Sequence, residues 1–191
     1  MSIDGGSTFT NAHETREIPI IAASVQRLIL PRQSQVWAVL RKADTLQRLS
    51  YSLTATFLGR MCLSGEVHDL DSTQWKLVIS AMELYRRVFP IIRDGNSTFH
   101  GKIGKSWRHP QGCQAVFRTG MSGKRAMLVA HTFAKPFAKK LKIPVSNGTS
   151  WRIEEVWPSK HGLSASLEDN NLTVGLSGSF RGVVVILRRG K

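Results

Sequence analysis

Cysteine is scarce in this sequence, with only Cys62 and Cys113 among 191 residues. Two cysteines are too few for a disulfide scaffold, and without a second pair they do not form a zinc site. The six histidines show neither the i, i+4 spacing nor the cysteine partners of a metal centre. We therefore expect no metal, no cofactor and two reduced, buried thiols.

A long hydrophobic stretch is also absent. No apolar run approaches the roughly 20 residues that span a bilayer, and the N-terminal residues lack the basic and then apolar segments of a secretory signal. Apolar residues make up 41% and charged residues 21%, which excludes a disordered or low-complexity chain. The sequence predicts a globular protein without a membrane partner, and we expect it in the cytoplasm.

Acidic residues are few, because 13 Asp and Glu stand against 27 Lys and Arg and give a formal charge of +14. Such an excess is typical of proteins with an anionic partner. The basic residues come in short clusters, and Phe137 is the only aromatic residue inside any of them. A single-strand or RNA reader needs a row of stacking aromatics. A solvated basic surface is therefore expected, nucleic acid is not an expected partner, and binding of another polyanion stays open.

The first half of the chain alternates between helical and strand patterns. Pro19 suits the first turn of a helix that Pro31 ends, and residues 34–40 are typical of a buried strand. Asp44 is a candidate cap for a second helix, and a short apolar piece at residues 60–63 follows it. Asp71 and Gln74 form a capping box that opens a long helix, which Pro90 should kink or shorten and Gly95 should stop.

This order of helix, strand, helix, strand, helix is typical of an α/β fold with parallel strands. Two parallel strands do not make a stable sheet alone, because a parallel sheet buries both faces and needs neighbours at its edges. Residues 1–95 are therefore interpreted as the closing repeats of a (β/α)8 barrel.

The second half changes its periodicity near Gly95. Short alternating runs take over, separated by turn sequences such as Asn147-Gly148 and Ser177-Gly178. The expected strands cover residues 113–119, 125–133, 150–157, 172–176 and 179–188. Residues 96–191 are predicted to form an antiparallel β-sandwich domain.

A family resemblance covers nearly the whole chain in the expected order. Residues 30–40, 51–53, 55–65 and 74–95 resemble the late barrel region of glycoside hydrolase family 36, the α-galactosidase family. The segments Gly112-Cys-Gln-Ala-Val-Phe-Arg118 and Leu128-Val-Ala-His-Thr-Phe133 resemble the C-terminal β-sandwich of the same family. The resemblance rests on order and extent rather than on one diagnostic motif.

The resemblance implies a retaining mechanism at α-galactosides, in which one carboxylate attacks the anomeric carbon and a second protonates the leaving oxygen. It places the aspartate nucleophile on a barrel strand that precedes Met1. Laying the family's Ser-Asp-x-Thr pattern over Ala12-His-Glu-Thr15 puts His13 at the position of the acid/base aspartate, with Glu14 beside it. Glu14 is therefore the candidate proton donor, and its alternative role is a helix-entry residue that the helix dipole favours.

Arg41 and Ser64 follow from the barrel interpretation. They stand where the last two strands end, which is the face that carries function in such barrels. We predict that both bind substrate, and a loop or helix-start role is the alternative for each.

The sequence thus predicts the C-terminal fragment of an α-galactosidase-like retaining hydrolase that acts on carbohydrate. The fragment is expected to be inactive alone, because the strands that carry the nucleophile are not in it. An upstream catalytic segment or a second copy of the chain is the expected protein partner. The alternative is a non-catalytic module that binds carbohydrate or a polyanion.

Overall fold

The computed structural model describes residues 15–104, 109–145, 150–159, 163–168 and 170–190. Its first part contains three α-helices and two strands in this range, in the order α2 (Ile18–Val25), β1 (Gln35–Leu40), α3 (Leu46–Thr56), β2 (Arg60–Gly65) and α4 (Ser72–Asp94). Short 3-10 turns at Pro31–Gln33 and Val67–Asp69 precede β1 and follow β2. The strands β1 and β2 pair in parallel, as the sequence predicts.

The remaining strands form two antiparallel sheets. A five-stranded sheet has the order β3-β4-β5-β10-β7, with bounds Asn96–Gly104, Gln111–Thr119, Arg125–Thr132, Gly182–Arg189 and Trp151–Trp157. A three-stranded sheet has the order β6-β9-β8, with bounds Lys140–Pro144, Asn171–Leu176 and Leu163–Glu168. The structure is therefore a mixture of helices and antiparallel sheets, with one added parallel pair.

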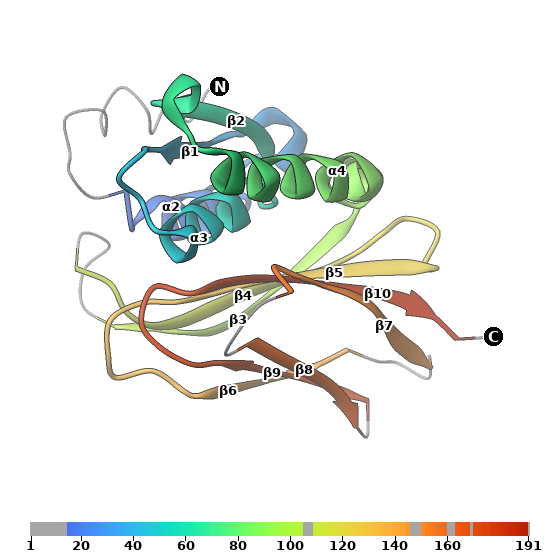
Figure 1. Ribbon diagram of the computed structural model, residues 1–191. Helices are drawn as coiled ribbons and strands as arrows, with labels where there is room; N and C mark the ends of the chain where they lie inside the picture. The colour runs from blue at the N-terminus through green and yellow to red at the C-terminus, as the bar shows by residue number, and fades with distance from the viewer. Residues whose placement is uncertain (1–14, 105–108, 146–149, 160–162, 169, 191) are drawn as a thin grey trace.

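The elements stack in layers (Figure 1). The helices lie between the β1–β2 pair and the five-stranded sheet, and the three-stranded sheet covers the other face of the five-stranded sheet. One apolar core joins helix residues such as Leu53 and Val78 to sheet residues such as Val129 and Ile186. A second core joins the two antiparallel sheets through residues such as Leu128, Val185 and Val174.

The division at residue 95 has a clear local basis, because α4 ends at Asp94 and β3 begins at Asn96. The first core nevertheless crosses this boundary, since it contains residues from both halves. The division into a domain of residues 1–95 and a domain of residues 96–191 stays a prediction.

Two local predictions are wrong. The first helix ends at Val25 rather than near Pro31, and Leu28 is 86% exposed. Thr45, not Asp44, caps α3 by accepting a hydrogen bond from the Arg48 N–H. Helix α4 ends at Asp94 with Gly95 as its C-cap, which confirms the predicted stop, and Pro90 does not shorten it. Ile91 and Ile92 beyond the proline are buried and pack the last turn against the core.

Helix α3 makes the closest contact between the helical layer and the five-stranded sheet. At Gly182, where β10 begins, an added Cβ would lie only 2.7 Å from the Cβ of Thr54. No residue larger than glycine fits at this position without moving the helix. The helical layer therefore lies directly on the backbone of β10.

Arg118 joins the helical layer to the sheet through buried polar contacts. Its guanidinium donates hydrogen bonds to Ser97 Oγ at 2.8 Å, to Gln26 Oε1 and to the Leu58 carbonyl oxygen at 3.4 Å. The side chain is 1% exposed, and burial lowers the pKa of Arg118 to about 10. The positive charge is thus stabilised by neutral oxygens from β3 and the helical layer.

His131 lies in the same junction and is fully buried. Its ring stands edge-on to Tyr51 at a centroid distance of 5.1 Å, and its Nε2 lies 3.4 Å from the Tyr51 carbonyl oxygen. Burial lowers the pKa of His131 to about 3, because the charged form would lose its hydration. The histidine is therefore neutral at physiological pH.

Candidate functional site

The carboxyl ends of β1 and β2 meet at one edge of the parallel pair. The register places Ser64 beside Val39 and Gly65 beside Leu40. The Glu66 N–H then donates to the Leu40 carbonyl oxygen at 2.8 Å, which extends the pairing by one residue. Arg41 follows Leu40 directly, so the structure brings the two predicted substrate-binding residues to the same edge.

Gly65 allows the two strand ends to approach each other. Its φ is +91°, and an added Cβ would lie 2.2 Å from the Leu40 carbonyl oxygen. A side chain at this position would be strained in its backbone and would collide with β1. The glycine is thus required by the geometry of the site edge.

Polar side chains hold the two loops that follow the strands. The Lys42 N–H donates to Glu66 Oε2 at 3.1 Å, and the Arg41 N–H donates to Asp44 Oδ2 at 3.1 Å. The Gln74 side-chain amide donates to the carbonyl oxygens of Lys42 and Asp44 at 3.0 and 2.9 Å. This network fixes the backbone on both sides of Arg41.

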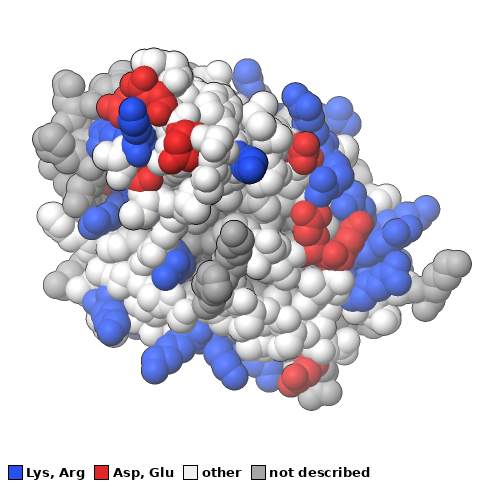
Figure 2. Space-filling model, viewed as in Figure 1, with Lys and Arg blue, Asp and Glu red and all other residues white. Residues whose placement is uncertain are grey.

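The carboxylates near this edge already have structural roles. Asp44 and Glu66 accept backbone N–H groups of the first loop, and Asp71 caps α4 by accepting from the Thr73 and Gln74 N–H groups. Asp69 pairs with His68 at 3.4 Å. Figure 2 shows acidic side chains at its upper left, over the loops that follow β1 and β2. Within the described ranges, these four carboxylates stabilise loops and the helix start rather than standing as a free pair.

The two faces of the β1–β2 pair have different surroundings. Val36, Ala38 and Leu40 belong to the core that the helices cover, and Met61 and Leu63 pack against it. Because side chains alternate along a strand, Trp37, Cys62 and Ser64 lie on the opposite face. All three are half-buried, whereas Val39 on the same face is 7% exposed and belongs to the first core. The helices lie on the other side of the pair (Figure 1).

Trp37 and Cys62 are site-face residues that the sequence interpretation missed. Trp37 lies in the strand that was expected at residues 34–40, and Cys62 was expected as a buried thiol, whereas of the two cysteines only Cys113 is buried. The Trp37 Nε1 has no hydrogen-bond partner among the residues that the structure describes. The sequence carries no clear signal for this face, because β1 is apolar on both faces and Val39, on the same face as Trp37, is buried as well.

The third predicted residue, Glu14, lies outside the described residues. Its assignment as proton donor therefore stays a prediction. Arg41 and Ser64 also stay predicted substrate contacts, although their common position at the strand ends agrees with that role.

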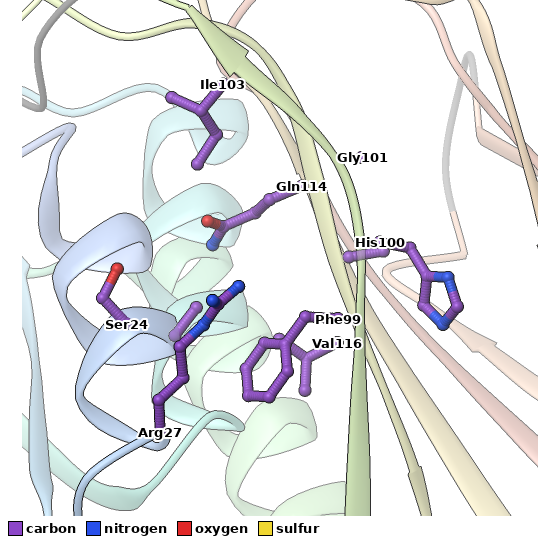
Figure 3. A pocket seen from close by; sticks show the side chains of 10 residues that line it. Ser24, Arg27, Phe99, His100, Gly101, Ile103, Gln114 and Val116 are labelled. Carbon is purple, nitrogen blue, oxygen red and sulfur yellow. The ribbon is translucent and has the colours of Figure 1, made fainter.

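A small cavity of about 200 Å³ lies between α2 and the β3–β4 edge of the five-stranded sheet. Figure 3 shows Ser24, Arg27, Gln114 and Phe99 on the helix side of β3, whereas His100 points away on the other side. The Arg27 guanidinium lies 5.0 Å from the centre of the Phe99 ring, and Gln114 Nε2 donates to the Pro19 carbonyl oxygen at 2.7 Å. The cavity is smaller than a usual ligand site, and its polar groups already have partners. We interpret it as a packing seam.

Among the described residues, no group of three or more His, Cys, Asp or Glu side chains is placed to hold a metal ion. No helix in the described part of the chain is long and apolar enough to cross a bilayer.

Comparison with known proteins finds similarity in structure and not in sequence. No protein-family model matches the chain, and no curated protein is similar to it in sequence. A variant of the GH36 α-galactosidase AgaA from Geobacillus stearothermophilus, in complex with raffinose, matches with a TM-score of 0.68 and 13% identity over 94% of this chain. A second crystal structure of AgaA from the same organism matches with a TM-score of 0.60 and 9% identity, also over 94% of this chain.

The galactosidase domain of the α-galactosidase–sucrose kinase AgaSK matches with a TM-score of 0.59 and 6% identity over 94% of this chain. The chain spans about a quarter of the length of these structures, since each match covers 25% of the other protein. The likeness is one of fold and covers only part of these glycoside hydrolases. In particular, the fold of this chain is similar to one part of the family 36 α-galactosidases, which confirms the resemblance at the level of the fold.

Proposed function

We propose that the chain forms the C-terminal portion of an α-galactosidase-like retaining glycoside hydrolase. In this proposal β1 and β2 are the last two strands of a (β/α)8 barrel, and the antiparallel sheets are the C-terminal sandwich. The observation that carries the proposal is the one-sided cover of β1 and β2: helices α2, α3 and α4 lie on a single face, as the outer helices of a barrel do. The similarity in fold to α-galactosidases supports it.

The opposite face would then line the sugar site. The Arg41 guanidinium and the Ser64 hydroxyl would bind sugar oxygens at the strand ends, and the Trp37 ring would lie deeper on the same face. Arg41 is fitted to this role because the loop backbone around it is fixed by Asp44, Glu66 and Gln74. The substrate class is an α-galactoside or a related carbohydrate.

Retaining hydrolysis needs two carboxyl groups about 5 Å apart, one as nucleophile and one as acid/base. The carboxylates at the strand ends instead hold loops and a helix start. We infer that the nucleophile comes from other barrel strands, supplied by a longer chain or by a partner, and that this chain alone is not a hydrolase.

Hydrolysis of a nitrophenyl α-galactoside tests the catalytic part of the proposal. The purified chain should release no nitrophenol above the uncatalysed rate. Turnover that disappears in Arg41→Ala and Ser64→Ala would show that this chain carries a complete site, and the proposed division of the active site would be wrong.

Protection of Cys62 tests the carbohydrate part. Because Cys62 and Ser64 share a face of β2, a galactose ring held there should slow modification of the Cys62 thiol by an alkylating reagent. Raffinose or galactose at high concentration should slow the reaction severalfold, and Arg41→Ala should remove the protection. Sorbitol at the same concentration controls for solvent effects. Equal rates with and without galactose would contradict sugar binding at this face.

The second candidate function is a non-catalytic module for carbohydrate or a polyanion. The excess of basic side chains favours it, and Lys and Arg side chains follow the lower rim of Figure 2. This candidate requires a basic site whose side chains can bind an anionic ligand.

A further inference from the structure

The outer face of the three-stranded sheet carries two polar rows. The register places Lys140 beside Gly175 and Gly175 beside Ser164, and in the next row Lys142 lies beside Thr173 and Thr173 beside Ser166. The alternate residues of these strands, such as Ile143, Leu172 and Val174, belong to the second core. The lysines and serines therefore point to the outside, away from the five-stranded sheet.

A cavity of about 790 Å³ opens at the first of these rows. The β5–β6 connection contributes Lys135, Phe137 and Lys139, and the sheet contributes Lys140 and Ser164. This volume is within the range of small-molecule sites. Figure 2 shows Lys and Arg side chains along the rim where β6 lies in Figure 1.

Gly175 keeps the floor of the cavity open. An added Cβ would lie 2.4 Å from Ser164 Oγ, so the Ser164 hydroxyl lies across the backbone of β9. A side chain at Gly175 would displace this hydroxyl. The row therefore presents an ammonium group, bare backbone and a hydroxyl side by side.

The charge of this cavity is not neutralised from within. No Asp or Glu is among its described lining residues, and no ion pair between described residues involves Lys135, Lys139 or Lys140. Three ammonium groups around one cavity repel each other and attract an anionic ligand.

A second cavity of about 570 Å³ adjoins the first, because Pro136 and Phe137 line both. Lys102 contributes to the second cavity. The half-buried Phe137 ring thus stands between two hollows that each contain lysine. A ligand with several rings in a row would fill both.

We propose that these two cavities bind an anionic oligosaccharide whose rings carry carboxylate or sulfate groups. A sugar ring packs its C–H face on Phe137, its anionic substituents pair with Lys135, Lys139 and Lys140, and its hydroxyl groups bond to Ser164. A single aromatic ring with a hydroxyl beside it fits a saccharide better than a nucleic-acid strand, which uses successive stacking rings. This site is separate from the β1–β2 edge and does not depend on the function proposed there.

Calorimetric titration of the full chain with a short oligogalacturonide at low ionic strength tests the proposal. We expect saturable binding that weakens with added salt, and no binding of the uncharged methyl-esterified oligomer. The double variant Lys139→Glu/Lys140→Glu should lower the affinity at least about tenfold, because it reverses two of the charges in the site. Phe137→Ala should lower it about fivefold without a change in charge.

The matched control is Arg188→Glu/Arg189→Glu, which changes the net charge equally at an exposed basic cluster on β10. It should change the affinity less than twofold, because salt screens the interaction between exposed charges that lie far from the ligand. Equal losses in the two double variants would show general attraction and overturn the site. Absence of oligogalacturonide binding, unchanged affinity in Phe137→Ala, or equally tight binding of single-stranded DNA of the same charge would each overturn it as well. Thermal melting of each variant verifies that it is folded.

Discussion

The five-stranded sheet has both faces covered, whereas the β1–β2 pair has helices on one face only. In the five-stranded sheet, alternate residues of one strand serve two cores: Val184 and Ile186 face the helices, and Val183 and Val185 face the three-stranded sheet. In β1 and β2 the second face carries a half-buried tryptophan, thiol and hydroxyl beside the buried Val39. A sheet with two apolar faces completes its own fold, whereas one with a mixed second face is suited to a site or to another part of a protein.

The largest expected effect concerns the junction between helices and sheet. Arg118→Ala should lower the free energy of unfolding by about 3 kcal/mol, because it leaves a cavity and removes the donors to Gln26 and Leu58. Urea denaturation measures this difference. The control Arg125→Ala removes a partly exposed ion pair with Glu154 and should cost less than about 1 kcal/mol. Equal losses in the two variants would show that Arg118 does not join the layers.

The pH dependence of stability provides the second test of the junction. His131 has a folded pKa of about 3 and an ordinary value of 6.5, so between these values the unfolded chain binds a proton that the folded chain does not. Stability from this group is complete above pH 6.5 and falls as the pH is lowered towards 3. The loss is about 1.4 kcal/mol per pH unit, or about 2 kcal/mol from pH 7 to pH 5.

Denaturant midpoints across this pH range measure the slope in the wild type and in His131→Gln, which does not titrate. The slope should be smaller in the variant, whatever its absolute stability. Parallel curves would mean that His131 is not the group whose burial is linked to acid unfolding.

The smallest energetic effect should come from the second face of β1–β2. Cys62→Ser should change the free energy of unfolding by less than about 0.5 kcal/mol, because Cys62 is half-buried and is not part of an apolar core. In the folded wild type one thiol per molecule should react with a disulfide reagent, and the 4%-exposed Cys113 should react only after unfolding.

The labelling reaction belongs at alkaline pH, because burial raises the pKa of the Cys62 thiol. Cys113→Ser should keep the fast reaction and Cys62→Ser should lose it. If neither thiol reacts in the folded protein, the second face of β1–β2 is covered. The contrast with the five-stranded sheet, which is covered on both faces, would then be wrong.

Much of the first half could be predicted from local chemistry. The capping box of Asp71 and Gln74 opens α4 as expected, and the buried strand at residues 34–40 is β1 with a one-residue difference. Helix α4 continues past Pro90 because Ile91 and Ile92 are buried, and the Gly95 N–H donates to the Ile91 carbonyl oxygen at 2.9 Å. Tertiary packing of this kind is not visible in a local pattern.

Three strands of the second half were not expected. Strand β3 contains Asn, Ser, Gly and Lys, which have weak strand preference, and it lies at a sheet edge. Strands β6 and β8 do alternate, as in Leu163-Ser-Ala-Ser-Leu167, so their signal was present in the sequence. The candidate site was predicted at Arg41 and Ser64, but the Lys135–Lys140 cavity was not, because only the pairing of β6 with β9 brings Lys140 beside Gly175 and Ser164.

The contact between Gly182 and Thr54 has a consequence for how this sequence can change over time. A larger residue at position 182 would strike the helix at once, whereas a smaller residue at position 54 leaves only a small gap. The nearest atom of Thr54 is its Cβ, which alanine keeps, so only glycine at position 54 would make room before Gly182 gains a side chain. Evolutionary drift of the helical layer over β10 is restricted to paths that pass through that intermediate.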